Sequence, residues 1–302
     1  MFFKNARIYR LTEAYPFSAT GFDEALNEHK FNPCTGQMAI SVGFDAPIEQ
    51  AKSIAQHLNG VILIAVRHQE KLLPAAVINE ELAPRIAKAE AEGCRPLSRK
   101  EKQALKEEIV QCLLPRAFSR STLTRAIIDQ ENGLIIIDTP SASRAEDVLA
   151  LLRKALGSLP VVPCMDANKL SVVMQQWVAG TNLPTGFTRG LSAIFKAPGE
   201  EGAVAKFENH LLSADEVQSH SEDKLVTEIE LHKPDVMTLR ISDNFTLKRI
   251  QWHEFTQATN EELGWEDVVL RLSADILVAR AAFVEFVVAT NNTLFNDGRE
   301  VV

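Results

Sequence analysis

Residues 94–125 read CRPLSRKEKQALKEEIVQCLLPRAFSRSTLTR and hold the densest positive charge in an acidic chain. The segment contains eight basic residues and three acidic ones, a formal charge of +5, whereas the whole chain of 302 residues carries −8. Charge segregated in this way is typical of a protein that meets a polyanion at one surface only. The eight basic residues are Arg95, Arg99, Lys100, Lys102, Lys106, Arg116, Arg120 and Arg125.

Ser98 followed by Glu101 forms a capping-box pattern, in which each side chain hydrogen-bonds the backbone N–H of the other. A helix is therefore expected to start at Leu97 or Arg99 and to end before Pro115. Its apolar residues recur at helical spacing, so they form a stripe that can pack against another element. The segment predicts one amphipathic helix that carries much of the charge.

Three basic residues of this helix, from Arg99 to Lys106, fall along one flank of the apolar stripe. A surface helix whose charges are merely solvated would show the same pattern, and this interpretation stays open for the helix alone. Just beyond the helix, however, Arg116 and Arg120 bracket Phe118. Two cations around an aromatic residue just after a helix end are harder to explain by simple solvation.

Two turn signals organise the first half of the chain. Asn59-Gly60 and Asn132-Gly133 each precede a short run of apolar residues, which is typical of hairpins that feed buried strands. Both strands are expected in one sheet, and the segment between them, Leu72–Ala117, is then an insertion. Its pattern is helical, with Pro84 opening one helix and Gly93 closing it, so the insertion should protrude.

The second half of the chain predicts a helix capped by Ser143, a glycine- and proline-rich break from about residue 166, and then a further domain. That domain should contain strands at 225–232, 236–242 and 246–252 and a closing helix at about 266–289. The expected fold class is α+β, with a central mixed or antiparallel sheet and helices. The expected layout is a central domain from 1–75 and 117–165, a helical tip at 76–116 and an α+β base at 166–302.

The composition excludes several classes of protein. Hydrophobic residues make up 46% of the chain, enough for a substantial core. Lys4 and Arg7 interrupt any signal peptide, and Arg280 and Glu285 interrupt the most apolar later stretch, so neither export nor a membrane partner is expected. The cysteines lie far apart, which favours reduced thiols in a cytoplasmic protein. They are Cys34, Cys94, Cys112 and Cys164.

Motifs of common enzymes are missing from the sequence. It contains no G-x-x-x-x-G-K-[ST], G-x-G-x-x-G, H-E-x-x-H or G-x-S-x-G, and its seven histidines show no paired ligand spacing. Asp138 ends an apolar strand like a metal-holding carboxylate, but the phosphate loop that such a site needs is absent. We therefore expect no catalytic residues, no metal and no cofactor, although a metal site assembled from distant residues stays open.

Several stretches resemble the RdgC family of bacterial recombination-associated proteins. They are Phe3-Lys4-Asn5 with Tyr9-Arg10-Leu11, the run from Leu113 to Arg120, Asn132-Gly133-Leu134-Ile135, and Ala145-Glu146-Asp147 leading to Leu151–Pro163. Their order and spacing agree along almost the whole chain, and residues 166–302 resemble the family more loosely. The resemblance implies a cytoplasmic, nucleoid-associated protein that binds DNA and limits RecA-dependent recombination. It also implies a ring-shaped homodimer with duplex DNA passing through a positively lined hole.

The resemblance assigns roles to particular residues. It implies that Phe118, with Leu114 and Pro115, lies at a dimer interface between tips, and that Arg95 and Arg116 face the hole. Some relatives carry several lysines in the base where this chain offers mainly Lys206. The pair Lys248 and Arg249, just after the predicted turn at Asp243-Asn244, extends the basic set. The candidate DNA-binding residues are therefore Arg95, Arg99, Lys100, Lys102, Lys106, Arg116, Arg120, Arg125, Lys206, Lys248 and Arg249.

The sequence is compatible with three classes of function. The first is a non-enzymatic DNA clamp, the second a metal-dependent nuclease or NTPase acting in recombination, and the third an adaptor that contacts RecA without DNA. A clamp that contacts only phosphates should bind tightly, tolerate any sequence and weaken steeply with salt. Whether single-stranded DNA competes with the duplex stays open.

Overall fold

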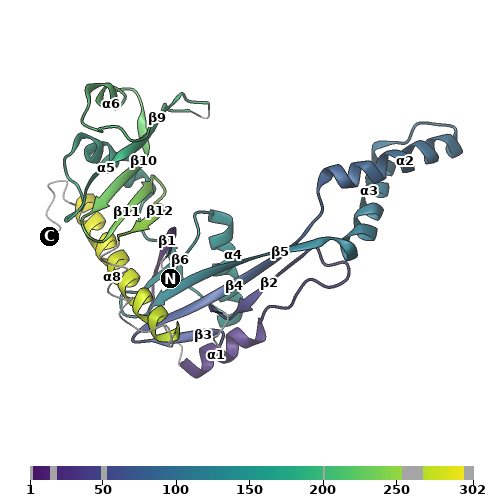
Figure 1. Ribbon diagram of the computed structural model, residues 1–302, viewed down its shortest axis with the longest axis horizontal. Helices are drawn as coiled ribbons and strands as arrows, with labels where there is room; N and C mark the ends of the chain where they lie inside the picture. The colour runs from purple at the N-terminus through teal and green to yellow at the C-terminus, as the bar shows by residue number, and fades with distance from the viewer. Residues whose placement is uncertain (1–2, 14–18, 49–52, 200, 254–267, 296–302) are drawn as a thin grey trace.

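The computed structural model describes residues 3–13, 19–48, 53–199, 201–253 and 268–295. They form one long antiparallel sheet with helices on its faces and a helical arm at one end (Figure 1). The strands are β1 (Ala6–Leu11), β2 (Ile40–Asp45), β3 (Ala55–Leu58), β4 (Val61–Leu72), β5 (Phe118–Asp129), β6 (Leu134–Ile137), β7 (Val161–Pro163), β8 (Thr188–Lys196), β9 (Val204–Phe207), β10 (Leu225–Lys233), β11 (Met237–Ser242) and β12 (Thr246–Trp252). The helices are α1 (Ala19–Glu28), α2 (Ala75–Gly93), α3 (Arg99–Leu113), the 3-10 turn η1 (Leu114–Arg116), α4 (Ala142–Leu156), α5 (Ala167–Ala179), α6 (Asp215–Ser219) and α8 (Val268–Phe295).

The order of the strands shows how the two halves of the chain join. The sheet runs β2-β4-β5-β6-β1-β12-β11-β10-β8-β9, with β3 paired to β4 and β7 paired to β1. All of these pairs are antiparallel, and one isolated parallel bridge joins Lys30 and Phe44. The α+β class is confirmed. β1 pairs with both β6 and β12, so one continuous sheet joins the strands before and after the predicted boundary near residue 166. The predicted domain limits stay predictions.

The two Asn-Gly turns lie where the sequence predicts them. Asn59 and Gly60 both adopt positive φ, +32° and +79°, and join β3 to β4, while Gly133 (φ +62°) lies between β5 and β6. Both β4 and β5 are longer than the apolar pattern indicates, and they pair over twelve residues each, from Val61 with Asp129 to Leu72 with Phe118. Their outer halves are polar and leave the body of the protein, so the hydrophobic pattern reports only the inner halves.

The arm at the end of these strands consists of α2 and α3 (Figure 1). The capping box is confirmed, because the Glu101 N–H donates to Ser98 Oγ (3.3 Å) and the Ser98 N–H donates to Glu101 Oε2 (2.8 Å). The expected start of the preceding helix at Pro84 is wrong. That helix begins at Ala75, after Pro74, and Pro84 lies inside it. Pro74 lies at the N-cap, where the helix needs no N–H donor, so this proline and not Pro84 marks the start of the helix.

Two hydrophobic cores lie on opposite faces of the sheet. One side of the central strands, including Ile62 and Ile64, packs against α1 and α4. The other side, including Leu63 and Ile127, belongs to a larger core with α5 and α8. The predicted cap of α4 is two residues off: Ser141, not Ser143, accepts the N–H of Arg144, because the helix already begins at Ala142.

Among the described helices of the base, α5 and α8 lie on one face of the sheet and none lies on the other, which we call the uncovered face. Along β10, Ile229 and Leu231 face the core with α5 and α8, whereas Glu228 and Glu230 alternate with them and face the other way. Figure 1 shows α5 and α8 on the side of the base strands away from the arm, so the uncovered face looks toward the gap between base and arm. Among the described helices, none combines the length and the apolar composition needed to cross a lipid bilayer.

Candidate nucleic-acid interface

The eight cations of residues 95–125 do not form a single continuous ridge. Arg95 precedes α3, four basic residues lie on α3, Arg116 lies in η1, and Arg120 and Arg125 lie on β5. They are therefore spread from the far part of the arm to the centre of the sheet. The local partners of each cation decide which of them can meet a ligand.

Two of the predicted cations on the arm are occupied by neighbouring carboxylates. Arg95 forms bidentate hydrogen bonds with Glu101, from Nη2 to Oε1 (2.6 Å) and from Nη1 to Oε2 (3.1 Å). These bonds from Arg95, together with those from Ser98, lower the pKa of Glu101 to about 2. Lys102 Nζ lies 3.2 Å from Glu90 Oε1 of α2 and so helps to hold the two helices together.

Four other cations of the arm remain available. Within the part of the chain that the structure describes, Arg99, Lys100, Lys106 and Arg116 make no ion pair. Arg99, Lys100 and Arg116 are exposed, and Lys106 is half-buried. These four residues, which we call the free arm cations, are the strongest candidates for contact with phosphate.

Both predicted cations of β5 have partners within the fold. Arg120 is exposed and donates from Nε to Glu70 Oε1 of the neighbouring strand β4 (3.0 Å). Arg125 is half-buried and donates from Nε to the carbonyl oxygen of Pro47 (2.8 Å), and its burial lowers the pKa of its guanidinium. The expectation that Arg125 contacts DNA is therefore not supported, because its side chain is engaged within the fold.

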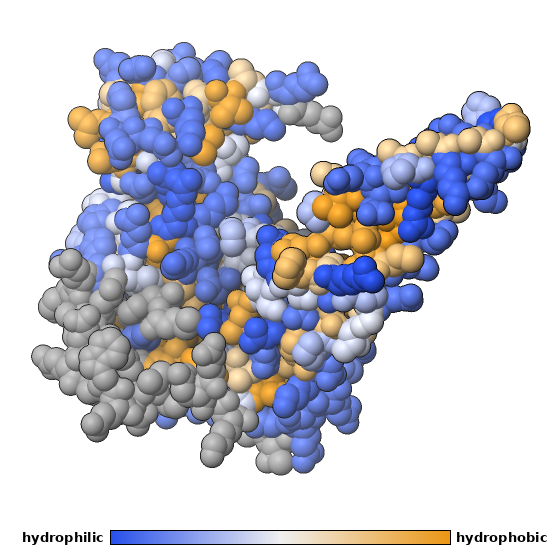
Figure 2. All heavy atoms as spheres, turned by 45° about the vertical axis from the view of Figure 1, so that its right-hand side comes forward, coloured by the Kyte–Doolittle hydropathy of each residue, from blue (hydrophilic) through white to orange (hydrophobic). Residues whose placement is uncertain are grey.

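Phe118 stands out among the predicted interface residues because 85% of its surface is exposed. Leu72, directly opposite on β4, is also exposed. Pro115 is exposed too, whereas the side chain of Leu114 is buried inside the arm, and its place at an interface stays a prediction. Figure 2 shows hydrophobic side chains gathered over the arm, beside the hollow that separates it from the body.

Sequence reasoning missed two exposed apolar residues that lie on the same face of the sheet as Phe118. Ile40 and Val42 on the edge strand β2 are both exposed, and their partners across β4, Glu70 and His68, lie on the same face as Leu72. Together, the exposed residues Phe118, Leu72, Ile40 and Val42 form what we call the arm patch. The alternation of apolar and polar residues in Ile40-Ser41-Val42 could have found them, because it marks one apolar face of a strand.

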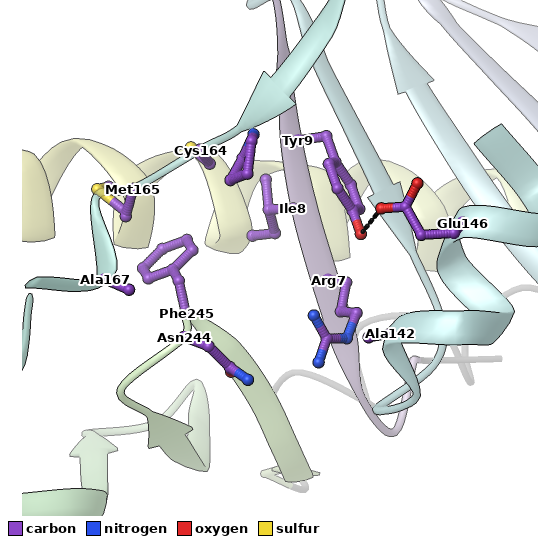
Figure 3. A pocket seen from close by; sticks show the side chains of 11 residues that line it. Arg7, Ile8, Tyr9, Ala142, Glu146, Cys164, Met165, Ala167, Asn244 and Phe245 are labelled. Atoms are coloured by element: carbon purple, nitrogen blue, oxygen red, sulfur yellow. Dashed lines mark hydrogen bonds between the residues drawn. The ribbon is translucent and has the colours of Figure 1, made fainter. Parts of the chain in front are cut away.

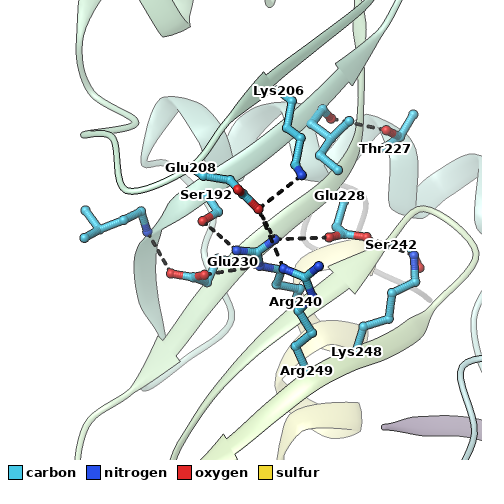
Figure 4. A network of polar contacts seen from close by, with 12 residues as sticks. Ser192, Lys206, Glu208, Thr227, Glu228, Glu230, Arg240, Ser242, Lys248 and Arg249 are labelled. Carbon is cyan, nitrogen blue, oxygen red and sulfur yellow. Dashed lines mark hydrogen bonds and ion pairs between the residues drawn. The ribbon is translucent and has the colours of Figure 1, made fainter.

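The predicted cations of the base meet on the uncovered face of the sheet (Figure 4). Lys206 Nζ lies 3.2 Å from Glu208 Oε1, Arg249 Nη1 lies 3.6 Å from the same oxygen, and Lys248 Nζ lies 2.9 Å from Glu228 Oε2. All three are therefore paired. Arg240 lies at the centre of this group, and its place at a polar position of β11, between the buried Leu239 and Ile241, was the signal that sequence reasoning did not use.

A cavity of about 310 Å³ lies between β1, α4 and the turn before β12 (Figure 3). Tyr9 Oη donates to Glu146 Oε1 across it (3.4 Å), and Arg7 Nε donates to the carbonyl oxygen of Pro140 (3.2 Å). Burial raises the pKa of the Cys164 thiol to about 11, so this cysteine is a poor nucleophile at neutral pH.

The cysteines and Asp138 complete the set of residues that the sequence singled out. All four cysteines are free thiols, as expected from their spacing. Over the residues that the structure describes, no three or more side chains of His, Cys, Asp or Glu come together in a way that could hold a metal ion. Asp138 lies directly after β6 and accepts the backbone N–H of Asn5 (3.2 Å), while burial raises the pKa of its carboxyl.

Comparison with known proteins agrees with the resemblance seen in the sequence. Residues 1–295 match the family described as "Putative exonuclease, RdgC". The chain is 37% identical over 281 residues to the recombination-associated protein RdgC of Pseudoalteromonas translucida, covering 92% of this chain and 93% of the relative. It is 39% identical over 280 residues to the RdgC of Yersinia enterocolitica, covering 92% of each, and 37% identical over 291 residues to that of Aeromonas hydrophila, covering 96% of each.

Proposed function

The chain belongs to the RdgC family, and we propose that it binds duplex DNA without sequence preference as a ring-shaped homodimer. In this role it limits RecA-dependent recombination at the nucleoid, in the cytoplasm. The observation that carries the proposal is the set of free arm cations in a chain of net charge −8. Because the rest of the protein repels a polyanion, contact with DNA has to be concentrated where unpaired cations are exposed.

Contacts from lysine and arginine to phosphate supply affinity without reading bases. Each phosphate that is neutralised adds about 0.9 to the slope of log affinity against log salt. Binding by the free arm cations should therefore weaken steeply as salt rises and should differ little between unrelated sequences. Binding that ignored salt, or that required one short sequence, would contradict this part of the proposal.

A second copy of the chain is the partner that the arm patch favours. Phe118 and its neighbours expose large apolar side chains at one place, which is typical of an interface. In a dimer with a two-fold axis the same patch serves both subunits, so no second kind of surface is needed at this contact. A ring would also let an acidic protein bind tightly, because the duplex cannot leave sideways once the subunits close around it.

An exonuclease is the second candidate function, since the description of the matching family names one. One incubation of the protein with duplex DNA, Mg²⁺ and ATP separates the candidates. Slower migration of intact DNA, with no ATP hydrolysed, supports the clamp. Shortened DNA supports the exonuclease, released phosphate supports an NTPase, and unshifted DNA leaves an adaptor that acts on RecA through protein contacts alone.

A further inference from the structure

The uncovered face of the base sheet carries a compact network of charged residues (Figure 4). Five neighbouring strands or their ends contribute to it, from β9 through β8, β10 and β11 to β12. It holds four cations and three carboxylates, so its local charge is +1. The members are Lys206, Arg240, Lys248 and Arg249 with Glu208, Glu228 and Glu230.

One part of the network is fixed in the sheet. The side chain of Arg240 is only 13% exposed and donates from Nε to Glu230 (3.3 Å), from Nη1 to Glu208 (3.1 Å) and from Nη2 to Ser192 Oγ (3.0 Å). Glu230 also accepts the backbone N–H of Leu191 (3.0 Å). Arg240 and Glu230 are half-buried and are held by partners from three strands, so they form the fixed, less exposed part of the network.

Glu208 belongs to the more exposed part of the network, together with Lys206 and Arg249. A single oxygen of its carboxylate, Oε1, is approached by Lys206 Nζ (3.2 Å), Arg240 Nη1 (3.1 Å) and Arg249 Nη1 (3.6 Å). Hydrogen bonds from Arg240 and then Lys206 lower the pKa of Glu208, so it is ionised at neutral pH. One anionic oxygen among three cations is the environment that a backbone phosphate oxygen finds in a DNA-binding site.

The contacts of Glu208 with its two outer cations can be exchanged. The side chains of Lys206 and Arg249 are 51% and 65% exposed, and that of Glu208 is 42% exposed. Ion pairs at such exposure are weak because water screens them. A carboxylate and a phosphodiester each carry one negative charge, so replacing the first by the second keeps the local charge balance while Arg240 retains Glu230.

We propose that Glu208 occupies the place of a backbone phosphate and that duplex DNA displaces it from Lys206 and Arg249. The inference rests on the proposed function and adds a regulatory element to it. In the free protein Glu208 keeps the outer cations together on a face that looks toward the gap between base and arm. When DNA binds, the same carboxylate competes with phosphate, and this competition limits the contribution of the base to affinity.

The test is Glu208→Gln, which removes the charge and keeps the size of the side chain. Duplex affinity is expected to rise about three- to five-fold at low salt, the size of one exposed ion pair. The salt slope should stay close to that of the wild type, because the same phosphate is engaged in both proteins once Glu208 has been displaced. In a Lys206→Met/Arg249→Met background the same substitution should give no gain.

The matched control is Glu285→Gln on α8, which changes the net charge equally. Glu285 pairs with Lys233, its side chain is 56% exposed, and its helix packs on the covered face of the sheet. Equal duplex affinities of Glu208→Gln and Glu285→Gln would overturn the inference, even if the wild type binds DNA as proposed. If Glu208→Gln fails to fold, Glu208→Asp, which withdraws the carboxylate by one methylene, should give a smaller gain, and no gain would overturn the inference as well.

DNA binding by the wild type distinguishes failure of the proposed function from failure of the inference about Glu208. A wild-type protein that binds no duplex at low salt overturns the proposed function and this inference together. A wild-type protein that binds, with Glu208→Gln indistinguishable from it, overturns the inference alone. Thermal unfolding of each variant shows whether a change in affinity comes from the site or from loss of structure.

Discussion

At the scale of residues, Arg280 and Asp129 connect the last helix to the central sheet. Asp129 is fully buried at the end of β5 and accepts Arg280 Nε (2.6 Å) and Nη2 (3.0 Å), as well as Asn132 Nδ2 (2.8 Å). Arg280 also contacts Glu131. The two partners are 151 residues apart in the chain, so no local pattern in the sequence could pair them.

Replacing Arg280 by methionine should destabilise the protein strongly. The substitution leaves the buried carboxylate of Asp129 without its cation, which costs about 3–5 kcal/mol. The measurement is the free energy of unfolding in urea. Arg85→Met is the control, because Arg85 pairs with Glu108 on the exposed surface of the arm and should cost no more than about 1 kcal/mol. Similar losses in both variants would contradict the role of Arg280.

The same pair predicts a dependence on pH. Burial alone would raise the pKa of Asp129, but its hydrogen bonds to Arg280 and Asn132 outweigh burial and hold it below the ordinary value of 3.8. A carboxylate with a lowered pKa in the folded state stabilises the protein above its unfolded pKa, and this stabilisation is lost as the pH falls through the folded pKa. The difference in unfolding free energy between wild type and Arg280→Met should therefore be smaller at pH 3 than at pH 7. An unchanged difference would contradict this assignment.

At the scale of elements, the sequence predicted what short-range chemistry determines. The capping box of Ser98 and Glu101 and the turns at Asn59-Gly60 and Asn132-Gly133 all depend on neighbours within a few residues. The polar outer halves of β4 and β5 were missed because they pack against no core and give no hydrophobic signal. The partners of Arg240 were missed because Glu208 lies 32 residues away and meets it only across the sheet.

The arm helices provide a test of the free arm cations. Lys100→Ala combined with Arg116→Ala should weaken duplex binding at low salt and reduce the salt slope by about 0.9 for each phosphate that is no longer neutralised. Lys88→Ala on α2 is the control, because Lys88 lies on the same arm but already has Glu92 as a partner. Titrations at several salt concentrations give both quantities. An unchanged slope in the double variant would show that these cations do not touch phosphate.

At the scale of the whole molecule, the fold places two features at a distance from each other. The free arm cations and the arm patch lie at one end of the sheet, and the network around Glu208 lies toward the other end (Figure 1). The continuity of the sheet between them follows from β1, which the sequence marks as a strand without indicating its neighbours. A rigid sheet is suited to holding two DNA-facing surfaces at a fixed separation.

Phe118→Ser tests the contact between two subunits. Because the side chain is exposed, the monomer should keep its stability, whereas self-association should weaken by at least about ten-fold, as expected for an interface aromatic residue. Sedimentation at a series of protein concentrations measures both states. Val288→Ser, at another exposed apolar residue on α8, is the control. A variant dimer as stable as the wild type, with equal DNA affinity, would refute the assignment of Phe118.

The central claim, that two copies enclose duplex DNA and hold it by its phosphates, can be tested by a salt challenge on closed circular and linear duplexes of the same sequence. Salt screens the phosphate contacts on both molecules, but a closed ring can slide off an open end and cannot leave a circle. We predict that protein remains on the circle at a salt concentration that strips it from the linear form. Equal release from both forms would contradict enclosure.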